Sequence, residues 1–477
     1  MTTAQTMVRP PPPPPPPGPP RNVQRNLTSQ SVRPPPPPPR GRPPPPPPPS
    51  SRNGKVRSTP PPPPPPPPRA SIGNKRAHKV TSACSPASRS PFPVHKKARL
   101  PRRGPVSFSA PVVMRDVDAF EKKFQVGEGT YGSVFVARDK TSNEVVALKR
   151  INTQQEENGF PITALREVKL LKGLKHPNMV ILKEIVCSKE QGTNGSLPKN
   201  VFMVFEYLEY DLTGVLETPE IRLTQDHVKS WSQQLLHGVH YMHKNKVIHR
   251  DLKASNLLIN RNGELKIADW GLARSWNKDM KRLTNKVITL WYRPPELLLG
   301  MIDYSTKIDM WSVGCIVAEM FRRSAFLRGQ NETNQLELIY KVCGTPNTQD
   351  WPLLETKCRH WNRFKPGPND KIYPNRLAQC LREKLPHPKW MTDDAVKMIG
   401  KLMEKNPDER WSAEKALDAD YFFETPIVKR ANELNMKFAV TSVHEMDCRK
   451  KFEQNEAKRQ AQIALARQQA AFAKSAS

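Results

Sequence analysis

The chain has 477 residues and a formal net charge of +31, from 76 Lys or Arg against 45 Asp or Glu. Its seven cysteines form no CxxC pair, which argues against a disulfide framework or a zinc site and favours a reduced intracellular protein. No stretch approaches the roughly 20 apolar residues that span a bilayer, and no signal-peptide run opens the chain, so we expect nuclear or cytosolic location and no membrane partner.

The first region, residues 1–115, is basic and rich in proline. It holds 38 of the 53 prolines and 20 Lys or Arg, but no acidic residue. Such sequence cannot bury enough apolar surface to offset its ordering entropy, so we predict disorder with local polyproline II structure. Its proline runs would suit the aromatic grooves of SH3, WW or profilin-type partners; a low-complexity tail without a dedicated partner is an equal alternative.

Within this region, residues 95–103 read HKKARLPRR. A basic cluster of this kind is a candidate nuclear-localisation signal, and a patch that touches nucleic acid weakly is the competing interpretation.

The composition becomes globular from about Phe120. Residues 124–137 alternate apolar positions around glycines and residues 144–149 follow as a second β-rich run, which predicts a hairpin and a third strand. Residues 161–174 carry helical apolar spacing, with Pro161 in the first turn. Residues 201–205, VFMVF, read as a buried strand.

The rest of the globular part reads as mostly helical. A long helix is predicted from Thr224 to His243, and helical patterns continue to about Phe423. A β-rich lobe therefore precedes a helical lobe. The residues beyond 423 form an extension whose end, 447–477, is rich in Ala, Gln, Lys and Arg; it reads either as a helix or as a frayed, solvated tail.

Two motifs carry chemistry. GEGTYG at 127–132 has the GxGxxG spacing, which is weak by itself, but its place in a β-hairpin before Lys149 favours a phosphate-covering loop over a dinucleotide-binding turn. HRDLKASN at 249–256, followed by ADWG at 268–271, is far more specific. This ordered set of charged and amide side chains is expected to handle phosphate and metal.

On these motifs, residues 120–423 resemble the eukaryotic protein kinases. The resemblance implies an α+β, two-lobed fold with ATP between the lobes and Mg²⁺ as the metal. Asp251 would accept or orient the proton of the substrate hydroxyl, and Lys253 would touch the transferring phosphate. The resemblance assigns the metal to Asn256 and Asp269. It assigns the ATP site to Val126, Gly127, Gly129, Gly132, Val134, Ala147, Lys149, Glu167, Phe205, Glu206, Leu208, Asp211 and Leu258.

Within this site the resemblance distinguishes several roles. Lys149 would hold the α and β phosphates and pair with Glu167. The backbone of Glu206 and Leu208 would meet the adenine, and Asp211 would approach the ribose. The apolar walls of the adenine pocket would be Val126, Val134, Ala147 and Leu258, with Phe205 at the back.

PITALRE at 161–167, TLWYRPPE at 289–296 and DMWSVGC at 309–315 resemble the transcriptional branch of the cyclin-dependent kinases. PITALRE matches the elongation-factor members of that branch, whereas GEGTYG and the hinge FEYLEYDL also resemble its proline-rich members. This resemblance implies a cyclin partner and an activating phosphothreonine at Thr284, clamped by Arg166, Arg250 and Arg274. The plain alternative is a solvated Arg166 and an unmodified Thr284.

The same resemblance implies a substrate. Val287 and Arg293 match positions that favour proline after the phosphoacceptor, so we expect Ser-Pro or Thr-Pro targets, foremost the YSPTSPS repeats of RNA polymerase II in the nucleus.

Two features depart from the pattern. Trp270 stands where these kinases usually have Phe, and the pair Thr130 and Tyr131 would permit the inhibitory phosphorylation of cell-cycle members. The alternatives are therefore a cell-cycle kinase, which PITALRE and the insert at 187–200 disfavour, and a non-catalytic scaffold that recruits partners through its proline tail.

Overall fold

The computed structural model describes residues 114–129, 132–151, 161–188, 200–277 and 283–475. The predictions for the proline runs, the basic segment 95–103, the pair Thr130 and Tyr131 and most of the insert at 187–200 lie outside these ranges. Within the described ranges, no helix combines the length and the apolar character needed to cross a membrane.

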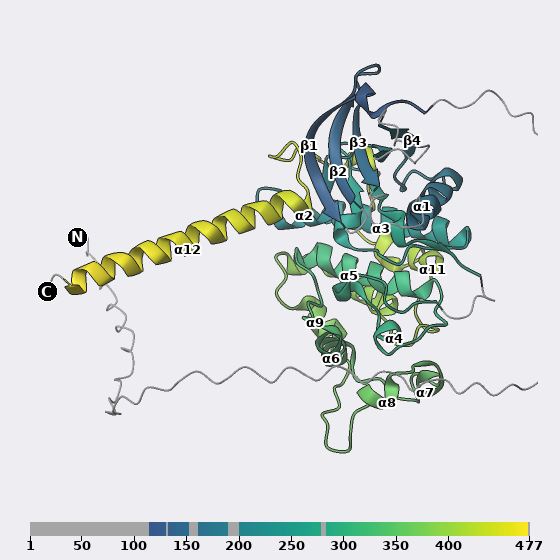
Figure 1. Ribbon diagram of the computed structural model, residues 1–477. Helices are drawn as coiled ribbons and strands as arrows, with labels where there is room; N and C mark the ends of the chain where they lie inside the picture. The colour runs from purple at the N-terminus through teal and green to yellow at the C-terminus, as the bar shows by residue number, and fades with distance from the viewer. Residues whose placement is uncertain (1–113, 130–131, 152–160, 189–199, 278–282, 476–477) are drawn as a thin grey trace, which may run out of the picture. The chain divides into compact units, whose positions relative to one another are not determined.

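The first lobe is a five-stranded antiparallel sheet in the order β1-β2-β3-β5-β4, with helix α1 (Ile162–Gly173) beside it (Figure 1). Because side chains alternate across a strand, the apolar side chains on one face of the sheet form a cluster of their own. The cluster includes Val146, Leu148 and Phe202, which are almost completely buried. The predicted β-rich lobe is confirmed. Its strands are β1 (Phe120–Gly129), β2 (Gly132–Asp139), β3 (Val145–Ile151), β4 (Leu182–Cys187) and β5 (Val201–Glu206).

Arg115, which the composition assigns to the basic tail, is bound to the first lobe. Its guanidinium donates to both oxygens of Asp139 at 2.9 Å and to Glu184 at 2.8 Å. This contact lowers the pKa of Asp139, chiefly through the Arg115 hydrogen bond. The net charge of the first region gave no sign of these contacts, because a charge count does not distinguish a paired arginine from a solvated one.

The second lobe is helical, as predicted, and is built around α3 (Gln225–Lys244) and α5 (Lys307–Arg322), which pack together. Most of the side chains they bury are apolar, and fourteen of the sixteen residues of α5 are buried. The lobe also contains a two-stranded sheet of β10 and β7 and a three-stranded sheet in the order β6-β8-β9. The other helices are α2 (Leu212–Glu217), α4 (Pro295–Leu298), α6 (Glu332–Cys343), α7 (Leu354–Lys357), α8 (Trp361–Phe364), α9 (Leu377–Arg382), α10 (Asp393–Leu402) and α11 (Ala413–Leu417), and the strands are β6 (Tyr210–Asp211), β7 (Val247–Ile248), β8 (Leu257–Ile259), β9 (Leu265–Ile267) and β10 (Arg274–Ser275).

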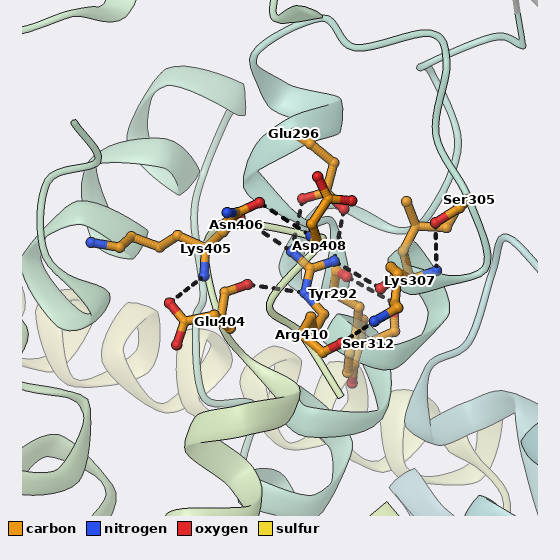
Figure 2. Close-up of polar contacts among 11 residues, drawn as sticks. Tyr292, Glu296, Ser305, Lys307, Ser312, Glu404, Lys405, Asn406, Asp408 and Arg410 are labelled. Atoms are coloured by element: carbon orange, nitrogen blue, oxygen red, sulfur yellow. Dashed lines mark hydrogen bonds and ion pairs between the residues drawn. The ribbon is translucent and has the colours of Figure 1, made fainter. Parts of the chain in front are cut away.

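A buried ion pair joins distant parts of this lobe (Figure 2). The Nη atoms of Arg410 donate to the two carboxylate oxygens of Glu296 at 2.7 and 2.9 Å, and both side chains are completely buried. Arg410 also donates to the carbonyl oxygens of Lys307 and Glu404, at 2.7 and 3.0 Å. A bidentate pair with its remaining donors satisfied is a strong, geometrically specific contact. It ties α4 to the start of α5 and to the loop after α10.

The first part of the C-terminal extension, residues 424–448, packs on the helical lobe. The ammonium of Lys229, fully buried in α3, donates to the carbonyls of Glu424 and Pro426 at 3.0 Å each. Further along, the backbone of Val443 pairs with the segment around Tyr210. Helix α12 (Glu445–Ser475) starts directly after this contact.

Candidate active site

A cleft of about 740 Å³ lies between the sheet and the helical lobe. Of the thirteen residues assigned to ATP, twelve line it; the other, Gly129, ends β1 and pairs with Gly132. The walls come from β1, β2 and β3 on one side and from β8 on the other. The chain between Glu206 and Asp211 closes the back of the cleft.

This back segment is held in place by the side chain of Glu206. One oxygen accepts the backbone N–H of Ile181 at 2.8 Å, and the other pairs with Lys266 of β9 at 3.1 Å. Two residues later, Leu208 is buried at the cleft, yet in the described part of the chain its backbone N–H and C=O have no hydrogen-bond partner. Buried backbone groups are rarely left unpaired, so this edge fits a planar ligand with one donor and one acceptor.

Lys149 of β3 joins two carboxylates from distant segments. Its ammonium donates to Glu167 of α1 at 2.9 Å and to Asp269 at 2.8 Å. Burial alone would lower the pKa of Lys149, but the two carboxylates outweigh it and raise the pKa. Burial likewise opposes the charged form of Asp269, and Lys149 outweighs it, so the pKa of Asp269 is lowered. Lys149 and Asp269 are therefore both charged at neutral pH.

The neighbours Arg166 and Glu167 face different surroundings, as their positions about 100° apart on a helix require. Glu167 is 3% exposed and pairs with Lys149, whereas Arg166 is exposed. Helix α1 thereby presents one charge to the cleft and one to solvent.

Asp251 lies at the floor of the cleft, in a loop held from below by Asp309. The carboxylate of Asp309 accepts the backbone N–H groups of His249 and Arg250, each at 3.0 Å. Asp251 itself accepts two bonds from Thr289, at 3.1 Å from the backbone and 2.9 Å from the hydroxyl. Lys253 is 3.7 Å away. Sequence reasoning missed Thr289, although it opens the quoted motif TLWYRPPE.

Two residues that line the cleft, Asn256 and Asp269, carry oxygen atoms of the kind that binds a hard cation. The amide nitrogen of Asn256 donates to the carbonyl and carboxylate of Asp251, at 2.8 and 3.3 Å. Among the described residues, the Oδ1 atom of Asn256 and the Oδ2 atom of Asp269 accept no hydrogen bond. Amide and carboxylate oxygens are the ligands that Mg²⁺ prefers, usually with phosphate and water completing its shell.

Tyr304 links the segment after Asp269 to the loop that holds Arg250 and Asp251. The Tyr304 hydroxyl donates to the carbonyl of Thr284 at 2.7 Å and accepts from Nη1 of Arg250 at 3.2 Å. Thr284 itself is exposed. Of the three arginines assigned to its clamp, Arg250 is thus linked to Thr284 through Tyr304, while no hydrogen bond in the described ranges links Arg166 or Arg274 to it. Sequence reasoning gave no signal for Tyr304.

Val287 and Arg293 flank a strained residue that sequence reasoning also missed. Ile288 has φ of +66°, which is unusual for a β-branched side chain. Arg293 donates to the carbonyl of Ile288 at 3.1 and 2.9 Å and pairs with Glu332 at 2.6 Å. Val287 is buried beside it, at 4% exposure. The Ile288 carbonyl is therefore already engaged by two hydrogen bonds from Arg293.

Comparison with known proteins decides the family. The model of the protein kinase domain matches residues 120–422. The chain belongs to the protein kinase family. Within that family it is similar to cyclin-dependent kinases. It is 46% identical over 363 residues to cyclin-dependent kinase C-1 of Oryza sativa subsp. japonica, covering 74% of this chain and 67% of the rice protein.

Other relatives agree on the class. Cyclin-dependent kinase 11 of Dictyostelium discoideum is 43% identical over 65% of this kinase and 82% of the relative. Cyclin-dependent kinase 12 of Caenorhabditis elegans is 46% identical over 62% of this kinase, but the match spans only 39% of the worm protein. Among solved structures, a chain of the yeast RNA Pol II CTD kinase CTDK-1 complex superposes with a TM-score of 0.59 at 38% identity, covering 69% of this kinase and 99% of that chain. The kinase is thus a Ser/Thr protein kinase of the cyclin-dependent class.

Membership of the family implies ATP and a divalent cation. The observed cleft fits both, because Leu208 offers unpaired backbone groups and Asn256 and Asp269 offer unpaired oxygens. The cavity is within the range of ordinary small-molecule sites.

The C-terminal extension contributes to the cleft of the kinase in a way that the sequence did not predict. Asp211, expected at the ribose, lines the cleft and also accepts two backbone bonds: from the N–H of Gly214 at 2.7 Å and from that of Glu445 at 2.6 Å. The start of α12 is thereby capped at the rim of the cleft. The residues of this segment that line the cleft are His444, Glu445, Met446, Arg449, Lys450 and Glu453.

Proposed function

We propose that this kinase is a cyclin-activated, proline-directed enzyme that transfers phosphate from ATP to the C-terminal repeats of RNA polymerase II in the nucleus. The observation that carries the catalytic part is the joined set of Lys149, Glu167 and Asp269, with Asp251 across the cleft. These four residues come from β3, α1 and two separate loops. A scaffold without catalysis does not need them in this arrangement.

In the proposed reaction, ATP would be held by Lys149 and by the backbone of Leu208, with Mg²⁺ on Asn256 and Asp269. Mg²⁺ supplies positive charge that offsets the charge on the phosphate oxygens. Asp251 orients the substrate hydroxyl and takes its proton, while Thr289 fixes the carboxylate from the other side. Lys253 adds a positive charge next to Asp251, where the incoming hydroxyl meets the phosphate.

The preference for proline follows from the orientation of Ile288. Its carbonyl is occupied by Arg293, so a substrate residue after the phosphoacceptor finds no acceptor there for its backbone N–H. Proline has no N–H to leave unpaired, and any other residue loses a hydrogen bond on binding. The polymerase repeats contain Ser-Pro pairs, and the yeast structure that the kinase resembles is that of an RNA Pol II CTD kinase complex.

A cyclin partner is supported by apolar side chains on the outside of the first lobe. Ile162 and Leu165, on α1, are 58% and 54% exposed, and Ile181, just before β4, is 53% exposed. Exposed apolar residues three apart share one helix face, and a cluster of this kind marks an interaction surface. A partner on this face would fix α1, and with it the pair between Glu167 and Lys149.

Phosphate transfer to repeat peptides tests this function. The kinase with its copurified cyclin should phosphorylate a YSPTSPS-repeat peptide about fivefold faster or more than a matched peptide with alanine in place of each proline, because a donor left unpaired on binding costs about 1–3 kcal/mol. Transfer is measured as phosphate incorporated per unit time.

Two results would contradict the proposal. Equal rates on both peptides would remove the proline preference, and full activity of the chain stripped of its cyclin would remove the activation by a partner.

Thr284 gives a separate prediction on regulation. Thr284→Ala should lower the rate of transfer by ten- to a hundredfold, because a phosphate there would make charge-assisted hydrogen bonds with Arg250 and the other arginines. Thr289 provides no suitable control, since it touches Asp251, so the matched change is Thr141→Ala on the surface of the first lobe. An unchanged rate in the Thr284 variant, with phosphate shown to be present on wild-type Thr284, would exclude the switch.

A further inference from the structure

We propose that Trp270 is a positioning residue that holds the metal-binding Asp269 in place through a hydrogen bond that the usual phenylalanine cannot make. The inference rests on the proposed function, because it assigns Asp269 to the metal. Trp270, which stands where these kinases usually have Phe, would then have a specific role in this kinase.

The hydrogen bond spans Asp269. The indole Nε1 of Trp270 donates to the carbonyl of Ile267 at 3.2 Å, and both residues are completely buried. Ile267 ends β9, where its N–H donates to the carbonyl of Asn178 at 3.0 Å and its carbonyl also accepts the N–H of Val180. The indole is therefore bonded to the end of β9, whose backbone is held on both sides of the peptide group. A phenyl ring has no donor with which to replace this contact.

Asp269 needs such support because its backbone is strained. Its φ is +58°, in the left-handed region that residues other than glycine adopt at a cost. It lies between Ile267 and Trp270, so the bond across it closes the turn. The strained conformation brings one carboxylate oxygen to Lys149 at 2.8 Å and leaves the other free among the described residues.

Packing around the indole links this turn to both sides of the cleft. The ring meets the His249 ring edge to face, with centroids 4.9 Å apart, and Nε2 of His249 lies 3.1 Å from the carbonyl of Ala268. The turn that begins at Trp270 also packs against α1, the helix of Glu167. Moving Trp270 outward would break the indole bond and expose the ring, so the structure opposes the outward position of this segment.

Trp270→Phe tests this role, with Trp231→Phe as a matched control. Trp231 is equally buried, and its indole donates to the carbonyl of Gly263 at the same 3.2 Å, but it lies in α3 outside the cleft. Both variants lose one indole bond and leave a similar void. Any effect of general destabilisation should therefore appear in both.

Two measurements on the complex with its cyclin decide the outcome. The first is hydrogen exchange of the backbone amides of residues 268–272 without nucleotide or metal, and the second is the Mg²⁺ concentration for half-maximal transfer at saturating ATP. We expect Trp270→Phe to raise the exchange rate of residues 268–272 and the half-maximal Mg²⁺ concentration by about tenfold each, as the loss of one buried hydrogen bond allows. Trp231→Phe should change neither quantity.

An unchanged exchange rate and Mg²⁺ requirement in Trp270→Phe would overturn the inference, and so would equal changes in both variants. The exchange experiment needs no catalysis. If the wild type transfers no phosphate, the proposed function fails, while the exchange rates still decide the role of Trp270.

Discussion

Replacement of Asp251 by Asn should lower the rate of phosphate transfer by about 10²–10⁴-fold, the usual contribution of a positioned acid or base. Asparagine keeps the size of the side chain and can still accept the two bonds from Thr289 through its amide oxygen. It cannot take a proton from the substrate hydroxyl. The binding of ATP should change little, because Asp251 lies on the floor of the cleft, away from Lys149 and Leu208.

Transfer to the repeat peptide is the measurement, with nucleotide affinity and the unfolding midpoint as controls on the same samples. An Asp251→Asn variant within tenfold of wild type would show that another group takes the proton. No transfer from wild type, with its cyclin present and a generic Ser-Pro peptide also unmodified, would favour the scaffold alternative.

Replacement of Arg410 by Leu should lower the free energy of unfolding by about 3–5 kcal/mol, because it leaves the buried carboxylate of Glu296 without its partner. The pair is completely buried and bidentate (Figure 2). The double variant Arg410→Leu, Glu296→Leu should recover much of the loss, since it removes both buried charges. Arg410 lies outside the cleft, so the folded fraction of the single variant should still bind ATP.

The free energy is measured by denaturant unfolding of the helical lobe, followed by tryptophan fluorescence. The exposed pair of Lys397 and Asp420, at 2.8 Å, supplies the control, because exposed ion pairs contribute little. If Arg410→Leu were no more destabilising than Lys397→Leu, the buried pair would have no role in holding the lobe together.

The sequence predicted the elements and motifs that depend on residues close together in the chain. The alternation in 124–137 and the apolar spacing in 161–174 predicted β1, β2 and α1, because side-chain periodicity is a property of a few neighbouring residues. The motif HRDLKASN placed Asp251, Lys253 and Asn256 together for the same reason, since they share one loop.

Other parts of the site depended on segments that are far apart in the chain. The composition assigned Arg115 to the basic tail, but Asp139 and Glu184 bind it in the fold. Asp211 was expected at the ribose, and it caps α12 from 234 residues away. Ile288 gave no local signal of its left-handed backbone, because a β-branched residue adopts that conformation only when its surroundings impose it.

The sequence by itself therefore determined the two-lobed kinase class, the order of its elements and the identity of the residues in its motifs. Only the tertiary structure decided what those residues contact: Lys149 with an acid 120 residues away, Arg250 with Tyr304, Trp270 with Ile267, and the C-terminal extension with the rim of the cleft. The physical reason is that local patterns encode which face of an element is apolar, whereas a contact between distant side chains exists only after the elements have packed.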